Sequence, residues 1–417
     1  MDLALAKKHD ELRRAACRLK TITSHDALVL LKASCSAPKI LHLLRSSPCA
    51  GHALLLEIDT VLRQCLCDIT NVNISDNHWR QASLPIKSGG LGIRNVSAIA
   101  APAFLASAAS TQQLQNKLLE RNINDLSDLH LAQVTADWQS SNPSASLPVG
   151  LLACKQRSWD QPSVDATFAE LLAEQPSNYH KARLLAAAAP HSGDWLHSLP
   201  ISSCGLRLDN QAISVAVGLR LGANLCEAHT CICGALVDCT GSHGLSCKRA
   251  AGRIVRHNYI NDLVYHALVK SGIPATKEPA GLSRTDGKRP DGITQTPWLS
   301  GKCAVWDVTV VNTLAESYLS STSVSAGSAA EIAAARKDEK YSTFATSHVF
   351  VPLAFESLGA IGSKATSFLR DLGHRLSVVS EDPRETSFLF QRLSVAIQRF
   401  NAVCFSGTFD RSLADSD

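Results

Sequence analysis

The run CEAHTCICGALVDCTGSHGLSC, residues 226–247, sets the organisation of this chain. It holds five cysteines and two histidines within 22 residues: Cys226, His229, Cys231, Cys233, Cys239, His243 and Cys247. Thiolates and imidazoles are ligands that zinc prefers, and four of them close a tetrahedral site. We expect Zn²⁺ to bind Cys231, Cys233, His243 and Cys247, with Cys226, His229 and Cys239 as alternative ligands. A closed site of this kind is structural, because the free energy of metal binding is also free energy of folding.

The spacing within the run supports this choice of ligands. Cys231 and Cys233 flank a single residue and are followed by Gly234, whose small size lets backbone N–H groups approach the sulfurs. His243 and Cys247 are four residues apart, which is the separation across one helical turn. The alternative is a set of buried free thiols, which the spacing of this last pair disfavours.

The composition indicates a globular chain that is mostly helical. Hydrophobic residues make up 45% of the 417 residues and charged residues 19%, which is enough for a substantial core. Aromatic residues are only 5%, while alanine and leucine are abundant, so helices are favoured over a β-sandwich. A signal peptide is not evident, and no apolar run reaches about 18 residues. We therefore expect no membrane partner and a nuclear or otherwise intracellular location, where clustered cysteines bind metal.

Positive charge is concentrated directly after the cysteine run. Residues 248–291 hold nine lysines and arginines against four acids, whereas the net charge of the whole chain is +4. A cluster of this kind suits the phosphate backbone of nucleic acids, and a solvated helix face is the alternative. The residues that we expect to hold nucleic acid are Arg253, Arg256, His257, Lys288 and Arg289.

Two aspartates follow in this part of the chain. Residues 304–311 form an apolar, β-branched strand pattern with Asp307 as its one acid, and Asp291 lies shortly before it. A carboxylate in a buried strand costs free energy unless it is paired or binds metal. If a strand that starts at Asp291 pairs with residues 304–311, both acids lie at one edge and can hold Mg²⁺, which activates water against a phosphate. The alternatives are a turn or N-cap residue for Asp291 and a buried salt bridge for Asp307.

A cation completes such a site, because it orients water or stabilises developing charge. The simplest nuclease pattern has a lysine two residues after the second acid, where this chain has Thr309. Residues 331–341 instead predict a helix with Lys337 and Lys340 on one face. We expect one of these lysines to reach the acids, and we expect the Ser- and Ala-rich residues 314–330 to be a flexible loop.

The first half of the chain predicts a helical region. The apolar spacing over residues 1–70 indicates three helices, with an interruption at Pro38. The glycines of residues 89–92 indicate a turn more than a phosphate-binding loop, because no Lys-Ser/Thr follows them. The predicted class is α+β, mostly helical, with four parts: a helical region 1–130, a helical linker 131–225, a zinc knuckle 226–250 and an α/β domain 251–417.

The ordered set of these motifs resembles non-LTR retrotransposon proteins that carry a restriction-enzyme-like endonuclease. Residues 84–93, LPIKSGGLGI, resemble the region after the reverse-transcriptase palm, and residues 231–247 are similar to the Cys-Cys-His-Cys finger of the family. Arg256-His257-Asn258 resembles a short motif at the start of the endonuclease. Three further parts of the chain resemble the nuclease core of the family: residues 288–291, Asp307 and the run from Lys337 to Tyr341.

This resemblance implies a Mg²⁺-dependent DNA endonuclease that nicks DNA to prime reverse transcription. It implies Asp291 and Asp307 as magnesium ligands and Lys337 or Lys340 as the catalytic cation. DNA is the implied partner. The RNA of the element and a separate polymerase subunit are possible further partners that the resemblance leaves open. The Tyr-x-Asp-Asp signature of the polymerase is absent, so we expect a chain that begins after the palm and has no polymerase activity. A non-catalytic, zinc-dependent nucleic-acid-binding protein and an inert remnant of the element are the rival interpretations.

Overall fold

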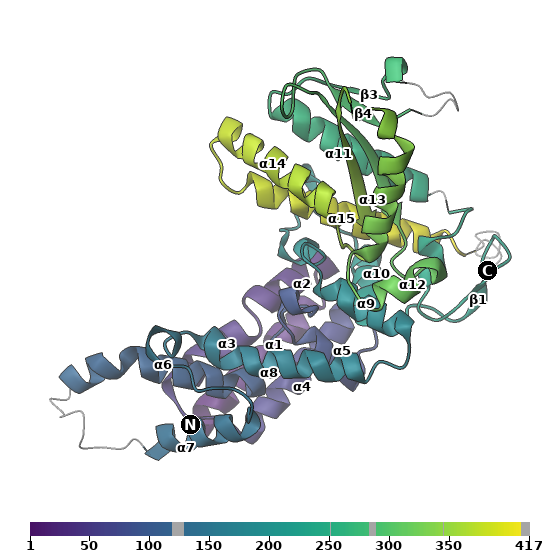
Figure 1. Ribbon diagram of the computed structural model, residues 1–417. Helices are drawn as coiled ribbons and strands as arrows, with labels where there is room; N and C mark the ends of the chain where they lie inside the picture. The colour runs from purple at the N-terminus through teal and green to yellow at the C-terminus, as the bar shows by residue number, and fades with distance from the viewer. Residues whose placement is uncertain (119–128, 251, 283–288, 345, 410–417) are drawn as a thin grey trace. The chain divides into compact units, whose positions relative to one another are not determined.

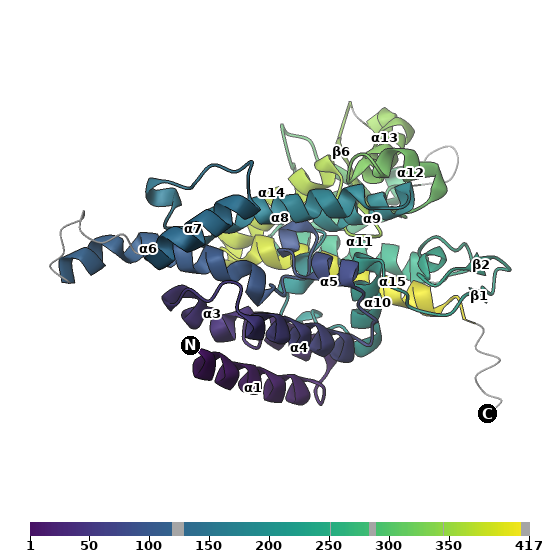
Figure 2. The ribbon, with the colours of Figure 1, turned by 90° about the horizontal axis from the view of Figure 1, so that it is seen from below.

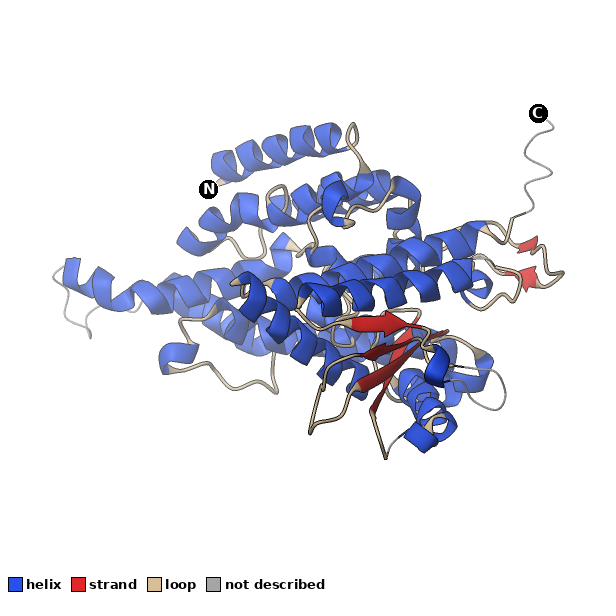
Figure 3. Cartoon of the chain, turned by 90° about the horizontal axis from the view of Figure 1, so that it is seen from above, coloured by secondary structure: helices blue, strands red, loops and turns tan. Residues whose placement is uncertain are grey.

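The computed structural model describes residues 1–118, 129–250, 252–282, 289–344 and 346–409 (Figure 1). The chain is mostly helical and contains two small sheets, which confirms the predicted α+β class at that level (Figure 3). It divides into two compact units, Met1–Glu174 and Gln175–Asp417. The boundary between these units falls inside the predicted linker region of residues 131–225, so the cysteine run and both aspartates belong to unit 2.

Unit 1 is built from helices that pack along one another. The helices are α1 (Asp2–Leu19), α2 (Ser24–Ala33), α3 (Ala37–Ser46), α4 (Ala53–Thr70), α5 (Asp76–Ala82), α6 (Val96–Leu118), α7 (Leu129–Ser141) and α8 (Gln156–Ala173). α1 lies beside α4 (Figure 2) and buries Leu5, Leu12 and Leu19, whose seven-residue spacing forms one apolar stripe. Four helices therefore occupy residues 1–70, where the sequence predicted three.

The extra helix arises at Pro38. This proline lies in the first turn of α3, where a missing N–H costs nothing because that position has no intrahelical acceptor. The segment Ser24–Ser46 has the length and hydropathy of a membrane-crossing helix, by length and composition only. The chain breaks this segment into α2 and α3, which pack on α4 and α6 respectively.

The glycines at residues 89–92 form a turn within unit 1. Gly89 and Gly92 have positive φ values of 85° and 75°, which favour glycine. A Cβ at Gly90 would lie 2.0 Å from the carbonyl oxygen of Leu84. Gly89 and Gly90 are buried, so this run closes a turn as predicted and does not present a loop to phosphate.

Unit 2 holds a four-stranded sheet with helices around it. Its main elements are α9 (Asn178–Ala188), α10 (Asn210–Leu221), β1 (His229–Thr230), β2 (Leu236–Val237), α11 (Gly252–Lys270), β3 (Ala275–Lys277), β4 (Gly292–Thr294), β5 (Ala304–Val311), α12 (Glu316–Thr322), α13 (Ser328–Lys340), β6 (Val349–Glu356), α14 (Ser363–Ser380) and α15 (Glu385–Ser406). The strand order is β3-β4-β5-β6. β5 and β6 are parallel, which requires a crossover, and α12 and α13 supply it.

The two faces of β5 have different surroundings: one packs into the main core, and the other carries Asp307. Trp306 and Val308 point into the main core, which also contains buried residues of α11, α14 and α15. Side chains alternate along a strand, so Asp307 points to the opposite face. α13 packs on β5 and β6 there, and its Lys337 contacts Asp307. The predicted strand over residues 304–311 is confirmed.

Two local predictions about unit 2 were wrong. Residues 314–330 are not a loop, because they form α12 and the start of α13. Alanine is a strong helix former and is small enough to pack closely, and Ala330, Ala333 and Ala334 are buried against Ala354 of β6. The apolar pattern of residues 252–272 predicts an amphipathic helix with Ile254 facing the core, whereas Ile254 of α11 is 70% exposed.

Candidate functional site

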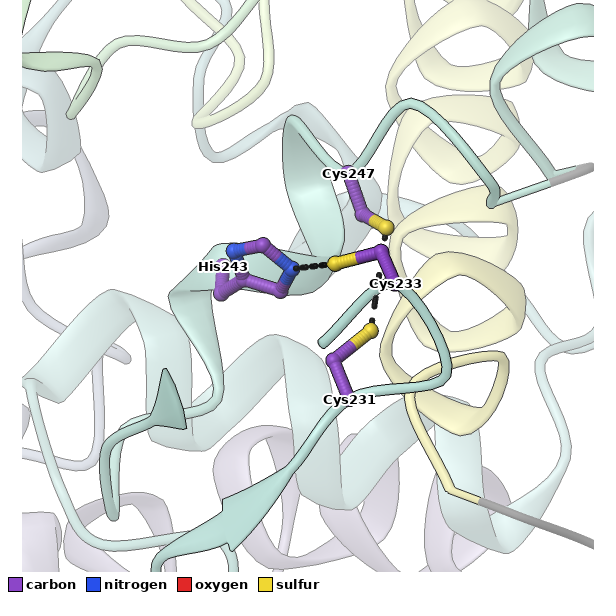
Figure 4. Close-up of side chains that lie close together, drawn as sticks. All are labelled: Cys231, Cys233, His243 and Cys247. Carbon is purple, nitrogen blue, oxygen red and sulfur yellow. Dashed lines mark hydrogen bonds between the residues drawn. The ribbon is translucent and has the colours of Figure 1, made fainter. Parts of the chain in front are cut away.

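The four predicted zinc ligands come together in unit 2. The ligand atoms of Cys231, Cys233, His243 and Cys247 all lie within 4.8 Å of one another (Figure 4). The sulfurs of Cys231 and Cys247 are 3.7 Å apart, and Cys233 Sγ is 3.2 Å from His243 Nε2. Three thiols and one imidazole at these separations could hold a tetrahedral metal such as zinc.

Local turns bring these ligands together. The hairpin β1–β2 carries the first pair at its tip, where Cys231 N donates to Ala235 O at 2.9 Å and Gly234 has a φ of +88°. A short 3-10 helix, Ser242–Leu245, carries His243. Cys247 N donates to His243 O at 3.0 Å, which is the helical-turn relation that their spacing predicted. The site is thus assembled almost entirely by contacts near in sequence.

The thiols of this cluster differ in their acidity. The backbone N–H of Ala235, directed at the Cys233 sulfur, is the largest cause that lowers the pKa of Cys233. Burial raises the pKa of the Cys231 thiol, which is deeper in the fold. Because metals bind thiolates, metal binding at this cluster would release the proton of the Cys231 thiol.

The alternative ligands lie outside the cluster and serve to anchor it. Cys226 Sγ is 3.5 Å from the carbonyl oxygen of Asp238. His229 Nε2 is 3.0 Å from Thr408 Oγ1, and its ring stacks on Phe409 at 4.2 Å. The two His229 contacts dock the β1–β2 hairpin on the residues that follow α15. A Cβ at Gly241 would lie 2.2 Å from the Phe405 ring, so the run packs closely against α15 as well.

The two aspartates lie on neighbouring chain segments of the sheet. β4 pairs antiparallel with β5, with Gly292 opposite Trp306. Asp291 immediately precedes β4, and its backbone N–H donates to Trp306 O at 3.0 Å. Its carboxylate Oδ2 accepts a hydrogen bond of 2.6 Å from Val308 N, the residue after Asp307. The predicted pairing of these segments therefore forms, and it places the Asp291 carboxylate against the backbone of Val308, next to Asp307.

Each aspartate has a basic partner. Lys337 Nζ lies 2.5 Å from Asp307 Oδ1, and the Asp307 side chain is only 5% exposed. His257 Nε2 lies 3.3 Å from Asp291 Oδ1. The hydrogen bond to Asp291 raises the pKa of His257, and the charges of both aspartates add to this effect. A carboxylate as buried as Asp307 needs a counter-charge, and Lys337 supplies it.

Lys337 and Lys340 have different surroundings. Lys340 Nζ is 2.9 Å from Tyr341 Oη and 4.5 Å from the centre of its ring. Tyr341 in turn donates to the carbonyl oxygen of Arg289 at 3.1 Å. Of the two lysines in the predicted pair, Lys337 contacts an acid, while Lys340 supports the segment that leads to Asp291.

The predicted nucleic-acid-binding residues differ in how exposed their side chains are and in what they contact. Arg256 is 1% exposed and donates to Asn401 Oδ1 at 2.7 Å, so its burial makes it a packing residue and not a surface contact. Arg289 pairs with Glu278 at the surface. Arg253 is exposed, and His257 contacts Asp291. The prediction for Lys288 lies outside the described residues.

A basic groove runs between the metal cluster and the aspartates. It has a volume of about 550 Å³, and its basic lining residues are Lys248, Arg249, Arg253, Arg256 and His257. Thr309 and Val310 of β5 form part of its wall. Arg249 donates to Ile232 O at 2.9 Å and Arg253 to Ser246 O at 3.2 Å, so backbone of the cluster holds these arginines.

Sequence reasoning did not assign three of the residues that matter here. Lys248 and Arg249 follow Cys247 directly, and that adjacency is a signal that they share its surroundings. Asn261 lies one helical turn after His257 and links both strands, since it accepts from Trp306 Nε1 at 2.8 Å and donates to Asp291 O at 3.4 Å. Nothing in its local sequence indicates this role.

No family model matches the chain, and a search of curated proteins finds no match either. The chemistry of the site is therefore argued from its geometry. Two carboxylates on paired segments of a sheet can bind a hard cation through oxygen, and the adjacent groove can attract phosphate.

Proposed function

We propose that unit 2 is a Mg²⁺-dependent DNA endonuclease of the kind carried by non-LTR retrotransposon proteins, which nicks DNA and has no polymerase activity. One observation carries this proposal. Asp291 and Asp307 lie on paired chain segments, Lys337 is 2.5 Å from Asp307, and a basic groove is lined by His257, which contacts Asp291. Phosphodiester hydrolysis needs a metal held by oxygen ligands, a cation and a surface that holds the phosphate backbone.

The donor set of the aspartates fits magnesium. Mg²⁺ prefers carboxylate oxygens and usually retains several waters, so two aspartates suffice as protein ligands. When bound, the ion supplies a Lewis acid that polarises the phosphate and activates water. Asp307 is fixed by β5, and Asp291 is oriented by the N–H of Val308. Lys337 stabilises the charge that develops on the phosphate, once its pairing with Asp307 is loosened.

We propose zinc for the Cys231, Cys233, His243 and Cys247 cluster, with a structural role. Three thiols with one imidazole suit zinc better than a hard cation. Because Arg249 and Arg253 donate to carbonyl groups of this cluster's segment, the bound metal fixes the walls of the groove. These basic side chains position DNA without selecting its sequence, since they offer contacts to phosphate.

The test is the nicking of supercoiled plasmid by the full chain with and without Mg²⁺. We expect conversion to open circles that requires Mg²⁺, and we expect Asp291→Ala and Asp307→Ala to abolish it while DNA binding persists. Asp371→Ala is the matched control, because this aspartate is exposed on α14, which packs in the core on the face of β5 opposite Asp307. Nicking that survives in both active-site variants contradicts the proposal.

A second candidate is a zinc-dependent nucleic-acid-binding protein without catalysis. The observation that favours it is the ion pair between Lys337 and Asp307, which neutralises the buried acid without a metal. The plasmid assay separates the two functions. DNA binding that depends on the groove, with no nicking in either Mg²⁺ or Mn²⁺, supports the second candidate.

A further inference from the structure

His257 lies where the basic groove meets the aspartates. It is on α11 and lines the groove, yet its Nε2 atom is 3.3 Å from Asp291 Oδ1. Its side chain is 34% exposed, so two thirds of its surface is covered by protein. This environment is unlike that of Arg253, which lies one turn earlier on α11 and is exposed.

The contacts of Asp291 show what His257 contributes. The backbone of Asp291 is held on both sides, since its N–H donates to Trp306 O and its carbonyl accepts from Glu278 N, each at 3.0 Å. The carboxylate is held by two further contacts, which are Val308 N to Oδ2 and His257 Nε2 to Oδ1. An ionised carboxylate only accepts hydrogen bonds, so the proton of this contact is on His257 Nε2. With one donor on each oxygen, lone pairs remain available on both.

We propose that His257 is a positioning residue of the nuclease site, and that its Nε2–H holds the Asp291 carboxylate in the orientation that binds the catalytic metal. This inference rests on the proposed function. Carboxylates that bind metals are themselves oriented by hydrogen bonds, and loss of such a partner typically weakens metal binding by about 10- to 100-fold. His257 therefore acts on the metal through Asp291, in place of the contact with the DNA backbone that the sequence predicted.

The two roles for His257 predict different measurements. A residue that contacts the DNA backbone contributes to DNA affinity and to its dependence on salt. A residue that orients Asp291 contributes to metal affinity and to the nicking rate at limiting metal. DNA affinity is then left to the exposed basic residues of the groove, which include Lys248, Arg249 and Arg253.

The experiment compares wild type with His257→Ala, His257→Gln and Arg253→Ala. Mn²⁺ binding to the protein without DNA is measured by electron paramagnetic resonance, with an Asp291→Ala/Asp307→Ala double variant as the background. Nicking is measured across a range of Mg²⁺ concentrations, and DNA binding is measured without divalent metal. Thermal unfolding of each variant checks that the fold is kept.

We expect His257→Ala to weaken Mn²⁺ binding by about 10- to 100-fold and to raise the Mg²⁺ concentration needed for nicking. Its DNA binding should match wild type. The amide of His257→Gln offers an N–H near the position of Nε2, so it should recover most of the metal affinity. Arg253→Ala should show the opposite pattern, with weaker DNA binding and unchanged Mn²⁺ binding.

Two results overturn the assignment of His257. One is Mn²⁺ binding by His257→Ala and His257→Gln that equals wild type. The other is a loss of DNA affinity in His257→Ala with no loss of metal affinity, which makes His257 a backbone contact. Failure of the proposed function looks different, because wild type then shows no Mn²⁺ binding above the double-variant background and no nicking.

Discussion

The metal cluster and the carboxylate site of unit 2 are assembled over different distances along the chain. The cluster ligands all lie between Cys231 and Cys247, and a hairpin and a helical turn bring them together. The carboxylate site draws on α11, β5 and α13, and spans residues 257–337. One site is therefore local, and the other depends on the sheet and the helices packed against it.

This difference indicates what stabilises each site. A local site with little core of its own would gain its order from a bound metal, whose binding free energy is coupled to folding. The carboxylate site is supported by Trp306, which is fully buried in the core, and by the pairing of β4 with β5. Its geometry should persist without any metal, because Lys337 and His257 already satisfy the acids.

Loss of the cluster metal should have the largest effect. Structural zinc contributes about 10–16 kcal/mol in small zinc-finger peptides, so Cys247→Ser should abolish stoichiometric zinc and disorder the run of residues 226–247. DNA binding should fall with it, since Arg249 and Arg253 lose the carbonyl groups that hold them. Elemental analysis and DNA-binding titrations measure both effects.

Cys154→Ser is the matched control for this change, because Cys154 is an exposed free cysteine in unit 1. Its zinc content and DNA binding should equal those of wild type. Full zinc content in Cys247→Ser would contradict the assignment of Cys247 as a zinc ligand.

The next largest effect should come from Lys337. Lys337→Ala removes the cation beside Asp307, and loss of one such group from a catalytic site typically lowers the rate by about 10²- to 10³-fold. Lys340→Ala is the control on the same helix and should lose less activity, because Lys340 donates to Tyr341 Oη, whereas Lys337 pairs with Asp307. Single-turnover nicking rates at saturating Mg²⁺ distinguish them, and equal losses contradict these separate roles.

Substitutions of Arg256 and Arg253 should have different effects: the first should lower stability and the second should weaken DNA binding. Arg256→Ala leaves Oδ1 of the buried Asn401 without the Arg256 donor, so the free energy of unfolding should fall by about 1–3 kcal/mol. Its DNA affinity should change little once the folded fraction is accounted for. Arg253→Ala should keep its stability and lower the slope of log affinity against log salt by about one, as expected for one lost phosphate contact.

Urea unfolding and salt-dependent DNA binding give these two quantities for each variant. The assignment of Arg256 to packing is wrong if Arg256→Ala changes the salt dependence of binding while its stability is unchanged.

Ile254 should give the smallest effect. Its side chain is 70% exposed, so Ile254→Ser should alter the free energy of unfolding by no more than about 0.5 kcal/mol. Val264→Ser on the same helix is the buried comparison and should be strongly destabilising, because a polar group would enter the core. Urea unfolding of the pair tests whether α11 faces the core as described.

The same contrast between local and distant contacts explains what the sequence predicted. The cluster ligands and the strand over residues 304–311 could be predicted because ligand spacing and β-branched runs are local signals. The start of α13 within residues 314–330 was missed because alanines of this helix gain stability from burial against β6, which local composition does not show.

The partners of two basic residues could not be predicted for the same reason. Arg256 is buried by a partner 145 residues away, Asn401, and a charge in a basic stretch gives no sign of such a partner. The sequence predicted His257 as a DNA contact because its neighbours are basic, and it gave no sign that His257 also lies 3.3 Å from Asp291. The division of the chain after Glu174 also depends on packing between distant segments.

If Asp307 and Asp291 form the catalytic metal site of a nuclease, plasmid nicking should be lost in Asp307→Asn. This substitution keeps the shape of the side chain and removes the charge that binds Mg²⁺. We predict that wild type converts supercoiled plasmid to open circles only when Mg²⁺ is present, and that Asp307→Asn at equal DNA occupancy does not. Nicking by Asp307→Asn at the wild-type rate would contradict the account.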